Sequence, residues 1–121
     1  MRIQENLEKS KYEADGSIQI QGTTIPYHTI CEDHFFVDEE NNPVASIFSY
    51  AYFRSDVQDN SKRPILFIYN GGPGCASLWL HMGLFGPRIV KLDDELNLPT
   101  VPPFELEDNP HCLLDLCDLV F

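Results

Sequence analysis

Alternation of apolar and polar positions predicts strands in the first half of the chain. Ser17 to Gln21 alternates strictly, which is typical of a strand with one buried face. The stretch Ile25 to Ile30 continues in an extended pattern. It contains Pro26, which has no N–H to offer a sheet ladder and therefore favours an edge strand or a bulge over a central strand.

The next two apolar segments predict a β-hairpin. His34–Val37 and Pro43–Arg54 are rich in aromatic and β-branched residues, which favour strands. The polar turn Asp38–Asn42 separates them, and Asn41 and Asn42 tolerate positive φ. Residues 38–42 therefore predict the turn of a hairpin, with Ala45–Phe53 as its long second strand.

A near-continuous apolar run, Pro64–Tyr69, precedes the most unusual local sequence in the chain. Runs of this kind are typical of a strand buried on both faces in a mostly parallel sheet. The run ends at Asn70-Gly71-Gly72-Pro73-Gly74. Ser77–Leu84 then predicts a short helix with Ser77 as its N-cap.

The last third of the chain predicts an acidic, proline-bearing loop followed by a helical turn and a strand. Asn109-Pro110 resembles a helix start, Leu113–Leu116 supplies one turn, and Leu116–Phe121 has the pattern of a buried strand. Because the sequence stops inside this strand, we expect an incomplete domain. Its unfinished sheet edge at Leu116–Phe121 favours self-association.

Length and composition fit one domain or part of a larger one. The chain has 121 residues, of which 43% are hydrophobic. Residues 1–16 are polar and charged and predict a flexible tail, which leaves residues 17–121 as the folded part.

The net charge of the chain and the spacing of its acidic residues and cysteines limit the ligands that the sequence predicts. The net charge of −11 disfavours binding to nucleic acid, because phosphates repel an acidic surface. No acidic cluster has EF-hand spacing, and the four cysteines match no zinc pattern, so neither a metal nor an organic cofactor is implied. No segment predicts a membrane span or a signal peptide, so we expect a cytoplasmic chain, or a secreted or periplasmic one if the true start lies upstream.

The Asn70–Gly74 segment has the composition of a loop that binds an oxyanion. Backbone N–H groups stabilise negative charge, and glycine lets a ligand approach them because it lacks a Cβ. A plain strand-to-helix turn is the alternative. The oxyanion interpretation requires amides that face away from the packed interior and a preceding strand that lies inside the sheet.

Three segments resemble the serine carboxypeptidases: Asn70–Gly74, Leu78–Pro87 and Asn109–Phe121. The resemblance implies the amino-terminal part of an α/β-hydrolase fold, in which an antiparallel hairpin leads into a mostly parallel sheet. It also implies a peptide substrate shortened from its carboxyl terminus through an acyl-enzyme.

Carried over by position, Asn70 and Gly71 bind the free carboxylate of the peptide, and Gly72 donates its N–H to the oxyanion. Two positions depart from the family, Leu84 and Ala76, and Ala76 stands where the family usually has serine. Leu84 stands where many members have a glutamate that supports carboxylate recognition. Cys75 matches a cysteine whose family partner lies far downstream.

The residues that would carry out catalysis are absent. The sequence has no Gly-x-Ser-x-Gly string, and the serine, acid and histidine of the family all fall beyond Phe121. We therefore expect no meaningful peptidase activity from these 121 residues alone. Two alternatives stay open: a non-catalytic binding module that keeps the sheet and loop, and a proline aminopeptidase-like hydrolase, although those enzymes carry histidine at the position of Asn70.

Overall fold

The computed structural model describes residues 9–121, and strands account for 43% of these residues and helical segments for 12%. The strands are β1 (Lys11–Ile20), β2 (Thr23–Val37), β3 (Pro43–Arg54), β4 (Ile65–Phe67), β5 (Arg88–Val90), β6 (Leu106–Asp108) and β7 (Asp118–Val120). The helical segments are η1 (Asn60–Lys62), α1 (Leu78–Leu80), η2 (His81–Phe85) and η3 (Leu113–Asp115).

The predicted α/β fold is wrong. Five strands form a mixed sheet in the order β1-β2-β3-β7-β4, and β5 and β6 form a separate two-stranded sheet. Within the five-stranded sheet only β4 and β7 run parallel. The helical segments are three to five residues long, so they cannot cover a sheet face as the helices of an α/β-hydrolase do. The apolar run that suggested a doubly covered sheet contributes only three residues to β4.

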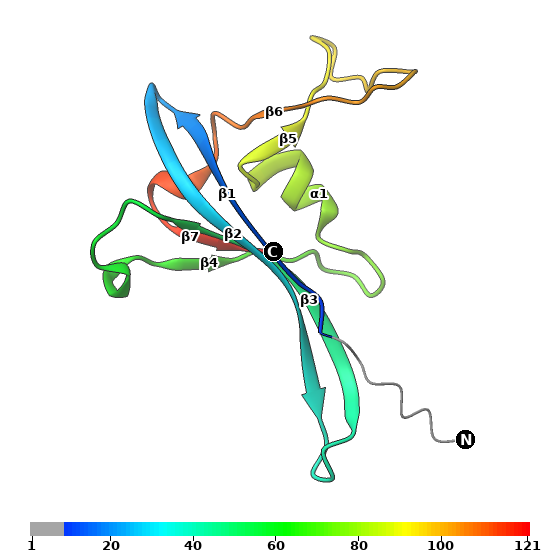
Figure 1. Cartoon of the computed structure of the whole chain (residues 1–121). Helices are drawn as coiled ribbons and strands as arrows, with labels where there is room; N and C mark the ends of the chain where they lie inside the picture. Colours follow the sequence, from blue (N-terminus) through cyan, green and yellow to red (C-terminus); the bar gives the residue numbers. More distant parts are fainter. Residues whose placement is uncertain (1–8) are drawn as a thin grey trace.

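The predicted hairpin is confirmed and forms the longest pairing in the structure. β2 and β3 pair antiparallel from Tyr27↔Arg54 to Val37↔Pro43, and the hairpin projects away from the rest of the chain (Figure 1). In the turn, Asn41 has φ +62°, and the Asp38 carboxylate accepts hydrogen bonds from the N–H groups of Glu40 and Asn42. The turn chemistry therefore behaves as the sequence predicts.

Strand β1 begins earlier than expected. Lys11–Gly16, which the sequence placed in the flexible tail, pairs with β2, whereas residues 1–8 lie outside the described part of the chain. Gly16 lies opposite Tyr27, and a Cβ there would come within 2.7 Å of the Tyr27 ring. Lys11–Asp15 are all exposed, so neither face of this part of β1 needs apolar residues, and the absence of an apolar repeat concealed the strand.

Pro26 does not mark an edge. β2 lies between β1 and β3 in the sheet. The Pro26 carbonyl accepts a hydrogen bond from the N–H of Ser55, which follows the last residue of β3, Arg54. Pro26 therefore lies at the end of the hydrogen-bond ladder between β2 and β3, where its missing N–H is tolerated. The side of β2 that pairs with β1 therefore loses no hydrogen bond.

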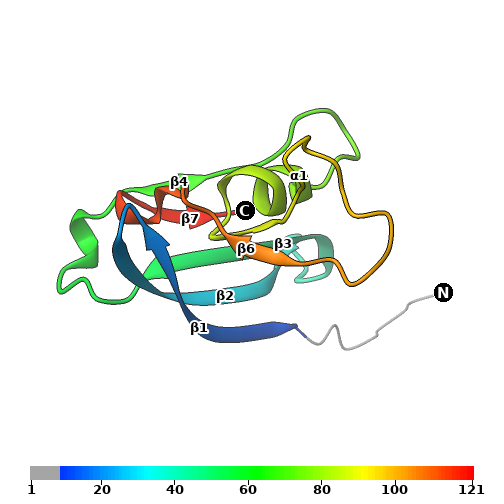
Figure 2. The ribbon, with the colours of Figure 1, turned by 90° about the horizontal axis from the view of Figure 1, so that it is seen from above.

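One core holds the sheet against the segments that connect the strands. Its buried residues come from β1, β2, β7 and the turns near them: Ile18, Ile20, Ile25, Tyr27, Ile68, Cys112, Leu114, Leu119 and Phe121. Leu80 and Phe85 of the α1–η2 segment pack against this cluster, and Figure 2 shows α1 and β6 above the β2–β3 ribbon. All four cysteines are free thiols, and burial raises the pKa of Cys112 to about 11.

The Asn109 side chain forms hydrogen bonds to the backbone of two segments before β7, but it does not cap η3. Its side chain is buried, and its Nδ2 donates to the carbonyls of Leu84 and Gly86 at 2.8 and 2.9 Å. Its Oδ1 accepts from the His111 N–H, while Cys112 stands at the N-cap of η3. The predicted helix start at Asn109 is therefore displaced by three residues.

The free sheet edge differs from the one that the sequence predicts. β7 forms within Leu116–Phe121 as expected, but it lies between β3 and β4, with Leu119 fully buried. β4 occupies the border instead, and all three of its side chains are exposed, with Phe67 at 65%. The predictions of an unfinished edge at Leu116–Phe121 and of a doubly covered strand at Pro64–Tyr69 are both wrong.

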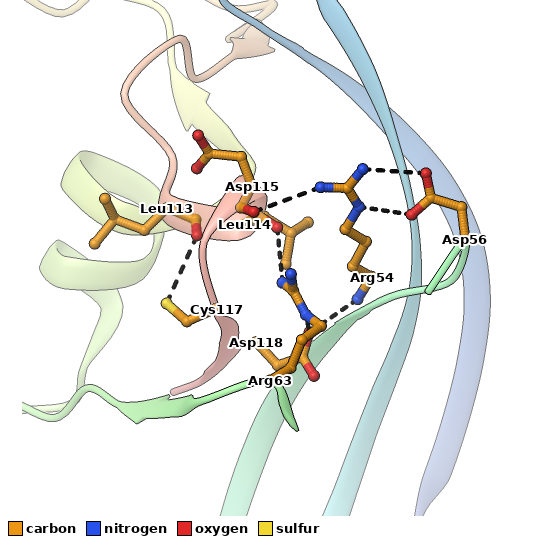
Figure 3. A network of polar contacts seen from close by, with 8 residues as sticks. All are labelled: Arg54, Asp56, Arg63, Leu113, Leu114, Asp115, Cys117 and Asp118. Carbon is orange, nitrogen blue, oxygen red and sulfur yellow. Dashed lines mark hydrogen bonds and ion pairs between the residues drawn. The ribbon is translucent and has the colours of Figure 1, made fainter. Parts of the chain in front are cut away.

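A buried ion pair ties β4 and β7 to β3 (Figure 3). The Arg63 Nε atom lies 3.0 Å from the Asp118 Oδ1 atom, and their side chains are only 10% and 5% exposed. Arg63 Nη2 also donates to the Leu114 carbonyl at 2.8 Å, and the Arg54 N–H donates to Asp118 at 3.0 Å. Each buried charged group therefore has more than one hydrogen-bond partner, which offsets the cost of removing it from water.

Candidate functional site: the Asn70–Gly74 loop

The Asn70–Gly74 loop leaves the border strand β4 and leads toward α1. Gly72 and Gly74 have φ values of +82° and +86°, a region that L side chains rarely adopt. A Cβ at Gly71, Gly72 or Gly74 would meet no heavy atom within 4 Å, and all three glycines are exposed. The backbone of this loop therefore faces open space and is accessible to a ligand.

Asn70 and Ser77 close the base of the loop. The Asn70 N–H donates to the Ser77 Oγ at 3.3 Å, and the Asn70 Nδ2 contacts the Cys75 Sγ at 3.3 Å. Ser77 makes no side-chain cap to α1, so its predicted capping bond is absent and its hydroxyl serves the loop instead. The Asn70 Oδ1 is buried without a partner. The Asn70 side chain, expected to hold a carboxylate, is therefore engaged in shaping the loop.

The glycine amides are the donors left for a ligand. Within residues 9–121, no group accepts a hydrogen bond from the N–H of Gly71, Gly72 or Gly74, whereas the Gly72 carbonyl accepts from Cys75 at 3.3 Å. Pro73 has no N–H. Several unpaired N–H groups on a short exposed loop give a concentration of partial positive charge that suits an anion.

An apolar cleft of about 800 Å³ adjoins the loop. Its walls come from β3, the loop, the α1–η2 segment and the end of the chain: Phe48, Tyr50, Tyr69, Asn70, Cys75, Ala76, Ser77, Leu78, His81, Met82 and Phe121. None of these side chains is an aspartate, glutamate, lysine or arginine. The cleft therefore suits an uncharged, bulky group next to the anion-binding amides.

His81 lines this cleft and is the only histidine among its lining residues. It is 6% exposed, stacks on Phe121 with ring centroids 4.6 Å apart, and its Nε2 lies 2.7 Å from the Tyr52 hydroxyl. Burial lowers the pKa of His81 and raises that of Tyr52, so burial favours the neutral form of both groups in this hydrogen bond. Its backbone carbonyl accepts from the Gly86 N–H at 2.9 Å, which closes a single π-helical turn.

The lowered pKa of His81 predicts acid-sensitive stability. The unfolded chain binds the proton near pH 6.5 while the folded chain resists it, so stability falls as pH drops below about 6.5, by up to about 1.4 kcal/mol for each pH unit until the folded pKa is reached. Urea unfolding at pH 7.5, 6.5 and 5.5 measures this loss. His81→Gln keeps an acceptor for Tyr52 without a titrating ring, and we expect a flatter profile; equal slopes in both proteins would contradict the assignment.

A second apolar groove, of about 700 Å³, lies over the sheet face that carries Ile65, Phe67 and Tyr69. At its far side the Ser49 Oγ lies 2.8 Å from the His34 Nε2. The Glu32 Oε1 lies 4.0 Å from that same nitrogen. A catalytic triad needs its acid on the opposite ring nitrogen, so this group is no triad. Sequence analysis missed the pair because it depends on strand register, which places Glu32 opposite Ser49.

The oxyanion interpretation requires two conditions together, and the structure contradicts one of them. The three loop glycines are exposed, but β4 lies at the border of the sheet rather than inside it, so the interpretation of Gly72 as an oxyanion donor fails this requirement. No serine of the chain occurs in Gly-x-Ser-x-Gly, and the structure brings none beside the loop except Ser77, whose hydroxyl is already bonded to Asn70. The geometry therefore favours anion binding over acyl transfer.

Two further searches bear on the class of site. Residues 9–121 contain no group of three or more histidine, cysteine, aspartate or glutamate side chains placed to hold a metal ion. Among the described helices, none has the length and apolarity needed to cross a bilayer. Comparison with known proteins found no matching family model, no matching curated protein and no matching solved structure.

Proposed function

We propose that the Asn70–Gly74 loop binds the terminal carboxylate of a peptide, the recognition step of a serine carboxypeptidase. One observation carries this proposal: Gly71, Gly72 and Gly74 are exposed residues, and their N–H groups have no acceptor among the described residues. The adjoining cleft offers an uncharged aromatic surface for the side chain of the last residue. The sequence resemblance independently assigns carboxylate binding to this loop.

The proposed role is recognition without turnover by these 121 residues. Acyl transfer needs an activated nucleophile, and none lies beside the loop among residues 9–121. The oxyanion donor that follows the nucleophile in α/β-hydrolases is missing with it. The buried His81 is no candidate base, because its Nε2 is occupied by Tyr52. The same observations favour the second candidate function, a binding module that takes up peptide carboxyl termini and performs no chemistry.

The loop proposal predicts that binding depends on the ligand carboxylate and on Gly72. N-acetyl dipeptides with a bulky apolar last residue are titrated as free acids and as amides by calorimetry. We expect the free acid to bind about 10-fold tighter or more, because the amide has lost the charge that strengthens each hydrogen bond. Gly72→Val places a branched side chain where the anion approaches and is expected to abolish binding.

Gly22→Val is the matched control. Gly22 also has positive φ, +78°, and open space around its missing Cβ, but it lies in the β1–β2 turn. Both variants therefore carry similar backbone strain, and only the one in the loop should lose the ligand. Equal affinity for acid and amide, or equal loss in both variants, would refute carboxylate binding. Stoichiometric labelling of a serine by a fluorophosphonate would overturn the absence of turnover.

A further inference from the structure

His81 stands in the wall of the apolar cleft beside the Asn70–Gly74 loop and packs against two other residues of that wall. Its ring lies against Tyr50 of β3, with centroids 4.7 Å apart, and against Phe121, with centroids 4.6 Å apart. Both of these rings line the cleft as well. His81 is only 6% exposed and lines the cleft, so water reaches its ring from this side.

Two tyrosines and the end of the chain supply the ionisable groups that face His81. From β3 these are the phenols of Tyr50 and Tyr52, and the Tyr52 hydroxyl lies 2.7 Å from the ring Nε2. The α1–η2 segment, Leu78–Phe85, has no other ionisable side chain. At the end of the chain, the Phe121 ring stacks on His81, and one oxygen of the terminal carboxylate accepts from the Tyr50 N–H at 2.8 Å.

A proton on His81 therefore depends on water from the cleft. Protonation gives the ring a full positive charge and an N–H on both nitrogens, and no hydrogen bond among residues 9–121 involves its Nδ1. Burial lowers the pKa of His81, so the surroundings already disfavour the charged ring. An apolar side chain in the cleft displaces the water that solvates this charge and makes protonation harder still.

We propose that an apolar side chain in the cleft and a proton on His81 compete, so that acidification releases a ligand whose last residue is apolar. The inference rests on the proposed function, which places that side chain in the cleft and its carboxylate at the loop, and it adds a proton as the regulator of the same site. The coupling is reciprocal: the proton weakens ligand binding by the factor by which the ligand weakens proton binding.

General electrostatics predicts the opposite pH dependence. The net charge of −11 becomes less negative as pH falls, and a positive charge on His81 attracts an anion, so both effects strengthen carboxylate binding in acid. The carboxylate of a peptide has a pKa of roughly 3.5 and stays ionised at pH 5. A loss of affinity between pH 7.5 and 5 that is confined to ligands with an apolar last residue therefore points to the cleft.

The test compares N-acetyl-Ala-Leu with N-acetyl-Ala-Gly, each as free acid and as amide, by calorimetry at pH 7.5, 6.0 and 5.0. Circular dichroism checks that the chain is folded at each pH. We expect the affinity for the leucine acid to fall about fivefold or more between pH 7.5 and 5.0, because its side chain occupies the cleft. The glycine acid uses the loop alone, and its affinity should stay level or rise.

Variants assign the effect to one ring. His81→Gln keeps a polar side chain beside Tyr52 without a titrating ring and should remove the fall in affinity. His34→Gln is the matched control, because His34 lines the other groove, and it should retain the fall. A chain extended by two glycines after Phe121 moves the terminal carboxylate away and should also retain it.

A second arm follows the His81 ring directly and depends on no variant. The ring signals of the labelled chain are titrated with pH by NMR, alone and with saturating ligand. We expect the leucine acid to move the midpoint of the His81 titration to lower pH, and the glycine acid not to lower it.

The outcomes separate this inference from the proposed function. If both acids bind more tightly than their amides but respond to pH alike, or if His81→Gln retains the fall, competition with a proton is overturned while carboxylate binding stands. Loss of the fall in the extended chain assigns it to the terminal carboxylate and also overturns the inference. If neither acid binds more tightly than its amide at pH 7.5, the proposed function fails and the inference fails with it.

Discussion

Arg63→Ala is expected to destabilise the fold by about 3–5 kcal/mol. The substitution leaves the Asp118 carboxylate, 5% exposed, without its charged partner, and it also removes a donor from the Leu114 carbonyl. Losses of this size are a large part of the roughly 5–15 kcal/mol that stabilises a small domain. Urea unfolding followed by circular dichroism measures the change.

Two controls make the Arg63 prediction specific. Lys62→Ala removes a neighbouring cation that is 85% exposed and should leave the unfolding midpoint nearly unchanged. The double variant Arg63→Met with Asp118→Leu removes both charges and should recover part of the stability lost in Arg63→Ala, because no unpaired charge remains. If Arg63→Ala behaves like Lys62→Ala, the buried ion pair does not hold β4 to β7.

Leu119→Ala is expected to cost about 2–5 kcal/mol. Leu119 has no exposed surface and lies at the centre of β7, between β3 and β4, so truncation leaves a cavity that its strand neighbours cannot fill easily. Leu116→Ala is the matched control. It removes the same atoms three residues away, from a side chain that is 67% exposed, and should change stability by no more than about 0.5 kcal/mol. Equal losses would show that β7 is not buried in this way.

Local patterns in the sequence predicted local structure well. The β2–β3 hairpin, its turn at Asn41, the helical segment after Ser77 and the strand within Leu116–Phe121 all follow from alternation and turn residues. Such signals work because they act between residues close in sequence. The polar start of β1 at Lys11 was missed because both faces of the strand are exposed there, which leaves no apolar repeat.

The arrangement of those elements could not be predicted in the same way. An apolar run such as Pro64–Tyr69 looks the same at the centre and at the border of a sheet, and only the pairing of β7 between β3 and β4 distinguishes them. The α/β prediction failed for this reason: a strand followed by a glycine-rich corner and a short helix is compatible with a mixed sheet that carries only short helical segments.

The candidate site was found from the sequence, but its chemistry was only partly predicted. The three glycines within Asn70–Gly74 identified the loop and predicted that its backbone is accessible. The engagement of the Asn70 side chain with Cys75 and the burial of His81 beside Tyr52 depend on contacts between distant residues. The position of the loop could therefore be predicted from the sequence, but the role of each side chain around it could not.

The most direct test of carboxylate binding is a nitrogen–proton correlation spectrum of the uniformly labelled chain, titrated with an N-acetyl dipeptide acid. Hydrogen bonding to a carboxylate should move the amide protons of Gly71, Gly72 and Gly74 downfield and saturably, while the dipeptide amide leaves them in place. Amide signals of these three glycines that stay fixed under the acid, while signals elsewhere respond to both ligands alike, would contradict the account.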